Sequence, residues 1–220
     1  MASTDWTRTP ITRIGGPFTR TVSAFCRPCN NGWMSRLETS ARPVLTSLID
    51  AADGTCIVLD RDQQLILARW AYKTLIVACA IDGAERVPRE HIQEFYGEVD
   101  PPATCWIRIG RSAMSINPQH GEHLGGVSFE PRTARIHDGS SIRELAVYQA
   151  RIRLLGVAFD VFGSPVAADG LALEPQASPE LVRALVPIWP VTHEQLSWPP
   201  ATSVDVLSAS DSGTQTDLRG

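Results

Sequence analysis

The stretch from Arg61 to Cys79 constrains the fold most, because it is long enough for a five-turn helix and apolar on almost every side. Asp60 and Gln63 have the spacing of a capping box, so we expect the helix to begin there. A helix with so little polar surface belongs in a protein core. Lys73 is the exception, and we expect its ammonium group to reach the surface or to pair with an acid.

The pattern changes from helical to alternating after residue 102. The segment 104–109 alternates, with Trp106 and Arg108 on one face and apolar residues on the other. Further strands are predicted at 127–129, 146–154 and 156–162. Strands that follow one another without long helices favour an antiparallel sheet. We therefore expect an α+β fold that contains a partial ββα zinc-knuckle segment, core helices and then an antiparallel sheet.

Four segments are expected along the chain. Residues 1–50 hold a strand at 19–25 and a helix from about Gly32, which Pro43 either ends or follows with a second helix. Residues 51–100 form a helical core, and residues 101–200 are β-rich, with one or two helical turns at 181–186. Residues 201–220 are small, polar and acidic, which predicts a disordered tail.

Charge is distributed unevenly over the 220 residues. The net charge is −4, which argues against nucleic-acid binding over the whole surface. Residues 1–42, however, carry six arginines and two acidic residues, a net charge of +4, which favours local phosphate contacts. The N-terminus has no secretory signal, and no apolar run reaches the length of a membrane span. Five cysteines with one close pair fit a reducing compartment, so we expect a cytoplasmic protein without a membrane partner.

The motif Cys26-Arg27-Pro28-Cys29 is the tightest group of metal-ligand residues in the chain. Its spacing allows both sulfurs to face one tetrahedral zinc ion, and Arg27 favours the thiolate form. A structural zinc site needs four ligands, and this motif supplies two of them. Cys56 is a candidate for a position near the motif, whereas Cys79 and the cysteine at 105 are expected in the core.

The residues GGPF (15–18), a short strand and CRPCNNGWMSRLE (26–38) resemble the second half of an HNH (ββα-metal) endonuclease module. The later segments ARWAYKT, IWP and WPP are similar to those of actinobacterial HNH-like proteins. The resemblance implies zinc held by Cys26 and Cys29. Together with the local charge it predicts weak binding to DNA through these residues: Arg20, Arg27, Asn30 and Arg36.

The first half of the HNH pattern supplies an earlier CxxC and a catalytic histidine, and neither precedes Cys26 in this sequence. The first histidine is His91. The chain resembles the family with its opening segment removed, by truncation or by a misplaced start codon. We therefore assign no catalytic residue and expect neither a catalytic divalent metal nor nuclease activity.

Two alternative functions stay open. One is a non-enzymatic α+β interaction module that binds a protein partner or further copies of itself, suggested by the outward-facing Arg151 and Arg153 of a predicted strand and by the segment Trp198-Pro199-Pro200. The other is a redox pair formed by Cys26 and Cys29. It is less favoured, because thioredoxin-like CxxC motifs follow the first strand of a βαβ unit.

Overall fold

The computed structural model describes residues 25–51, 54–82, 86–112, 125–138, 141–165, 183–200 and 202–204. The helical elements are α1 (Arg27–Cys29), the π-helical segment η1 (Asn30–Met34), α2 (Ser35–Ala51), α3 (Arg61–Asp82) and α4 (Arg89–Glu98). The strands are β1 (Ile57–Asp60), β2 (Cys105–Ser112), β3 (Gly125–Asp138), β4 (Ser141–Leu154), β5 (Val157–Gly163), β6 (Leu185–Trp189), β7 (Gln195–Trp198) and β8 (Ser203–Val204). The strand predicted at 19–25 falls outside this range except for Phe25.

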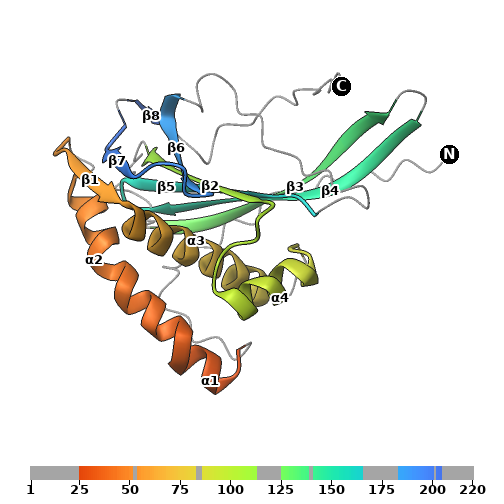
Figure 1. The fold of residues 1–220 in the computed structure, drawn as a ribbon, viewed down its shortest axis with the longest axis horizontal. Coiled ribbons are helices and arrows are strands. Elements are labelled where there is room, and N and C mark those ends of the chain that lie inside the picture. The colour runs from red at the N-terminus through yellow and green to blue at the C-terminus, as the bar shows by residue number, and fades with distance from the viewer. Residues whose placement is uncertain are drawn as a thin grey trace, which may run out of the picture.

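One sheet forms the larger layer of the molecule. Its strand order is β3-β4-β5-β2-β6, with β8 also paired to β2. Every pairing is antiparallel except the short one between β2 and β8. The helices cover one face of this sheet, with α3 lying directly beneath the strands and α2 running away from them (Figure 1). The α+β class and the antiparallel sheet are therefore confirmed.

Helix α3 occupies the centre of the core, as its composition predicted. The capping box closes in both directions: Asp60 accepts from the Gln63 N–H at 2.8 Å, and Gln63 Oε1 accepts from the Asp60 N–H at 3.0 Å. Trp70 and Tyr72 are fully buried, and Lys73 pairs with Glu38 of α2. By length and composition α3 could cross a membrane, but 61% of its apolar window is buried inside the protein. Core helices of soluble proteins pass the same test.

The two faces of the sheet follow the alternation seen in the sequence. Residues Cys105, Ile107 and Ile109 of β2 are completely buried and belong to one hydrophobic cluster with α2, α3 and β5. The same cluster includes residues before 50, between 51 and 100, and after 101. Segments that were distinguished by composition thus share a single core.

Two local predictions are wrong. The helix continues through Pro43, because the apolar face of α2 packs on α3 and the carbonyl that loses its partner belongs to exposed Thr39. The helical turns predicted at 181–186 do not include Leu185 and Val186, which belong to strand β6 because pairing with β2 satisfies their backbone groups; residues 183–184 are helical. In the predicted tail, Ser203 and Val204 form β8, and residues 205–220 lie outside the described range.

Arg151 does not point into solvent, and its exposed fraction is only 1%. The strand register places Asp160 of β5 opposite both Arg151 of β4 and Arg108 of β2. Asp160 accepts hydrogen bonds from Arg108 at 2.6 Å and from Gln149 at 2.6 Å, and the Arg151 Nε lies 3.7 Å from it. The second face of the sheet therefore carries a buried ionic cluster, which offsets the cost of burying Arg151.

Strand β7, near the C-terminal end of the described residues, packs against β1 and α2. Strand β7 pairs with β1, so that Ile57 lies opposite Trp198. The Trp198 side chain is fully buried and donates from its indole N–H to the Leu48 carbonyl of α2 at 3.0 Å. The last long-range contacts thus fix α2 against the remainder of the core.

Candidate metal and nucleic-acid site

The two sulfurs of the CxxC motif lie side by side at the start of the helical region. Cys26 and Cys29 Sγ are 2.6 Å apart, and the Cys29 N–H donates to Cys26 Sγ at 3.3 Å. Cys26 is the N-cap of α1, with Pro28 in the first turn, so the helical region begins before Asn30 and Asn31. The helix expected from about Gly32 is thus preceded by α1, and the helical region has a kink at Gly32, whose φ and ψ are not helical.

The pKa values of the two cysteines shift in opposite directions. Hydrogen bonds from the Cys29 side chain and backbone lower the pKa of Cys26. The hydrogen bond between the two thiols raises the pKa of Cys29. The Trp33 side chain has the opposite, smaller effect and lowers the pKa of Cys29. Cys26 is exposed and Cys29 is half-buried. The solvent-facing Cys26 is thus the member of the pair that loses its proton more readily, and the thiolate is the reactive and metal-binding form of cysteine.

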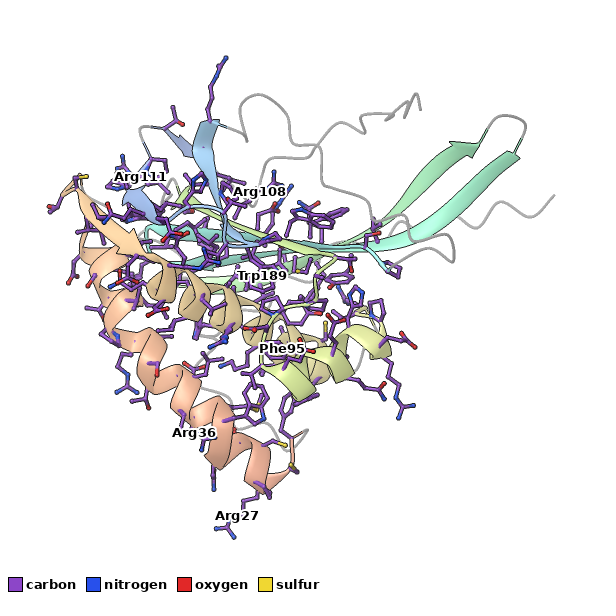
Figure 2. The ribbon with its side chains drawn as sticks, in the orientation of Figure 1. Arg27, Arg36, Phe95, Arg108, Arg111 and Trp189 are labelled. Atoms are coloured by element: carbon purple, nitrogen blue, oxygen red, sulfur yellow. The ribbon has the colours of Figure 1, made fainter. Side chains whose placement is uncertain are left out.

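Aromatic packing fixes the position of the pair relative to α4. Trp33 makes edge-on contacts with Phe95 and Tyr96, with ring centroids 5.5 and 5.6 Å apart. Phe95 is buried between α4 and the other helices (Figure 2), whereas Tyr96 is half-buried and close to the pair. Burial, and then the charges of Cys29 and Cys26, raise the pKa of Tyr96. The aromatic contacts of Trp33 with Phe95 and Tyr96 therefore hold the CxxC segment against α4.

Two cysteine sulfurs are the candidate zinc ligands among the described residues. In a tetrahedral site with zinc–sulfur distances of about 2.3 Å, two thiolates lie roughly 3.8 Å apart. The sulfurs of Cys26 and Cys29 lie 2.6 Å apart, so they would have to move apart only slightly to bind zinc. Within the described ranges no group of three or more histidine, cysteine or acidic side chains can hold a metal ion. The two candidate ligands predicted from the sequence lie side by side, the described residues add no third one, and zinc binding stays a prediction.

The other cysteines lie elsewhere. Cys79 and Cys105 are buried, and desolvation raises the pKa of the Cys105 thiol. Cys56 is exposed but follows α2, whereas the CxxC motif precedes it. A 17-residue helix spans about 25 Å, which separates Cys56 from the motif and excludes its predicted position nearby.

The described histidines do not face the pair. His91 is buried, and its ring nitrogens contact the hydroxyls of Tyr148 at 2.9 Å and Thr104 at 3.3 Å. Burial lowers the pKa of His91. His193 is exposed in the connection between β6 and β7. The side chains of the other three histidines, at 120, 123 and 137, lie outside the described part of the structure.

A basic surface surrounds the CxxC motif. Arg27, Asn30 and Arg36 are exposed, and Figure 2 shows both arginines pointing away from the protein. Glu38, the one acidic residue between 25 and 49, turns inward, where it accepts from the Trp70 indole at 3.1 Å and pairs with Lys73. This inward pairing leaves no outward acidic side chain among the arginines between residues 25 and 49, and the next acid on α2 is the exposed Asp50 near its end.

Two further arginines, Arg20 and Arg42, bear on this surface. Arg20 falls outside the described residues. Arg42 is exposed on α2 and adds a third positive charge, although the motif did not single it out. The signal that could have found it is the absence of any acid between residues 39 and 49.

The features that suggested an interaction module are used inside the chain. Arg151 is buried in the ionic cluster, and Trp198 is buried against α2. Trp189 is half-buried and donates to the Pro102 carbonyl at 3.1 Å. Arg151, Trp189 and Trp198 thus stabilise the fold, whereas Arg153, Pro199 and Pro200 are only half-buried, and the interaction hypothesis stays a prediction.

Of the residues that carry the HNH resemblance, only CRPCNNGWMSRLE (26–38) lies around Cys26 and Cys29; GGPF (15–18) falls outside the described residues, and ARWAYKT, IWP and WPP belong to α3 and to the ends of β6 and β7. Residues 26–38 include two adjacent sulfurs, the asparagine that follows them and exposed arginines on the same helical region. The family assignment stays a prediction. Comparison of the chain with protein-family models, with curated proteins and with solved structures found no match.

Proposed function

We propose that this chain is an HNH-endonuclease-related protein that binds zinc through Cys26 and Cys29 and contacts nucleic acid weakly through the adjoining arginines, without cleaving it. The convergence of an exposed and a half-buried cysteine sulfur at the start of an arginine-bearing helical region carries this proposal. Zinc bound there would fix the start of the helix and would supply no nucleophile.

Charge supports the nucleic-acid part. Arg27, Arg36 and Arg42 are exposed on one short helical region, while Glu38 is held by Lys73. Phosphate binding needs such uncompensated positive charge and shows a steep salt dependence. Three contacts correspond to a slope of about −2.7 in a logarithmic salt plot for duplex DNA.

The lack of a suitable base supports the non-catalytic part. An HNH nuclease uses a histidine to activate water beside its metal, and His91 has both ring nitrogens close to buried hydroxyl groups. A histidine with these partners cannot accept a proton from water without first leaving them. The described residues therefore offer no general base beside the cysteines.

Fluorescence anisotropy with a labelled duplex tests the binding proposal. From 50 to 200 mM salt, the affinity of the unaltered chain should fall about 40-fold, because three phosphate contacts contribute. The Arg27→Gln/Arg36→Gln variant should lose only about 3- to 4-fold over the same range, since one contact remains. Arg183→Gln, which removes an exposed arginine from outside this helical region, is the matched control.

Equal salt slopes for the double variant and the unaltered chain would show that these arginines do not contact phosphate. A plasmid-nicking assay with magnesium or manganese tests the second part. We expect no cleavage above a protein-free control. Metal-dependent cleavage that co-purifies with the chain and is lost in a histidine variant would overturn the non-catalytic assignment.

A further inference from the structure

We propose that two copies of this chain bind one zinc ion between them, each through Cys26 and Cys29, and so form a zinc-bridged homodimer. This inference rests on the metal-binding role proposed above. It adds the source of the two missing ligands.

One chain has too few accessible cysteines near the pair to complete a zinc site, so we look to a second copy of the chain for the other two ligands. A structural zinc ion takes four ligands, most often cysteine and histidine. Cys79 and Cys105 are enclosed in the core, and Cys56 lies beyond the far end of α2. No third ligand stands near the pair among the residues that the structure describes. A second copy supplies two sulfurs with the same spacing and the same surroundings.

The position of the pair allows such an approach. Cys26 is exposed, and α1 lies at the end of α2 that is farthest from the sheet (Figure 1). Two copies can therefore meet at this tip while the rest of each copy points away. A two-fold axis through the zinc ion makes the contact self-complementary, so the assembly stops at two chains.

Charge favours the same arrangement. A zinc ion with four thiolates has a net charge of −2, and each copy brings Arg27, an exposed cation located between its two ligands. The Arg27 side chains of the two chains together offset this charge of −2, whereas one Arg27 would offset only half of it. The Trp33 side chain that hydrogen-bonds to the Cys29 sulfur would in addition orient that ligand in each copy.

The binding step balances without a redox partner. Two chains with four thiols and one Zn²⁺ ion give one bridged dimer and release up to four protons. Four zinc–sulfur bonds form, and up to four sulfur–hydrogen bonds break. Binding should therefore weaken as the pH falls, because the thiols regain their protons.

Zinc titration of the full 220-residue chain tests the proposal. The protein is stripped of metal, kept under a phosphine reductant and titrated with Zn²⁺ against a chromophoric chelator, while light scattering follows its mass. We expect saturation at half a zinc ion per chain and a rise in mass from 24.0 kDa to twice this value. Cys26→Ser and Cys29→Ser should lose both effects, and Cys56→Ser, which alters an exposed cysteine at the other end of α2, should retain them.

The outcomes separate the two proposals. One zinc ion per chain that stays monomeric would overturn the bridge and preserve the metal-binding role. An absence of zinc binding at micromolar concentration would overturn both. A dimer that forms equally without zinc, or with Cys26→Ser, would show that another surface joins the copies and would also overturn the bridge. Circular dichroism of each variant verifies that the comparison is made on folded protein.

Discussion

Replacing Gly163 with alanine should be among the most destabilising single changes in this fold. A Cβ at this position would lie closer than 3.0 Å to the ring of Tyr148, which faces Gly163 across the β4–β5 pair. Tyr148 is only 4% exposed, so its ring has little room to retreat. Its hydroxyl is also bound in place, at 3.1 Å from the Tyr72 hydroxyl and 2.9 Å from His91 Nδ1.

The magnitude follows from these contacts. Moving the ring far enough to admit a methyl group breaks both hydrogen bonds, and each buried polar group left without a partner costs about 1–3 kcal/mol. Overpacking of a filled core costs about 1–3 kcal/mol as well. Because the ring has to move to admit the Cβ, the loss of the two hydrogen bonds sets the cost, and we expect Gly163→Ala to lower the free energy of unfolding by about 2–6 kcal/mol.

Urea unfolding followed by tryptophan fluorescence measures this loss. Gly126→Ala in β3 is the control, because a Cβ there meets nothing within 4 Å and should change stability by less than about 0.5 kcal/mol. The added cost of Gly163→Ala should be smaller in a Tyr148→Phe background, where the hydrogen bonds are already absent. A difference below about 1 kcal/mol between the two alanine variants would refute the reasoning, since the ring would then have a second place to go.

Three further changes test other parts of the core. Asp160→Asn should cost about 3–5 kcal/mol, because Arg151 loses its buried counter-charge; urea midpoints that match the unaltered chain would contradict this. Burial lowers the pKa of Lys73 from 10.5 to about 8, despite its contact with Glu38. The unfolded chain therefore binds more protons between these pH values, and the free energy of unfolding should rise by about 3 kcal/mol from pH 8 to 10.5. This rise should be absent in Lys73→Met when both proteins are melted at each pH. Trp198→Phe removes the donor to a buried carbonyl of α2 and should cost about 1–3 kcal/mol in the same denaturation assay, whereas an unchanged midpoint would show that water replaces the indole.

Local signals predicted the parts of the fold in which local energetics dominate. The capping box at Asp60 and the apolar composition of α3 gave both the start and the burial of that helix. The alternation in β2 gave its buried face, because a strand's side chains alternate whatever its partners are.

The failures occur where distant segments decide the outcome. Pro43 is tolerated because α2 packs along its whole length against α3, which no window around residue 43 reports. Arg151 is buried because the register of β4 on β5 places it opposite Asp160. Residues 185–189 are extended because β2 offers them a pairing edge. Register and strand order are properties of the whole chain, and they override local propensity.

The candidate site shows the same division. The CxxC spacing predicts that the two sulfurs can converge, and the structure brings Cys26 and Cys29 within 2.6 Å of each other. The aromatic contacts of Trp33 with Phe95 and Tyr96 could not be read from the sequence, because α4 reaches Trp33 from about 60 residues away. Zinc and nucleic-acid binding stay predictions for the experiments above.

The pairing of β1 with β7 has a consequence for how the protein is made. About 140 residues separate Ile57 from Trp198, which lie opposite each other in the folded chain. Translation at 5–20 residues per second puts roughly 7–28 s between the synthesis of these two positions. During that interval α2 lacks the indole that will bind its Leu48 carbonyl. The native core can therefore be completed only after the ribosome has added Trp198.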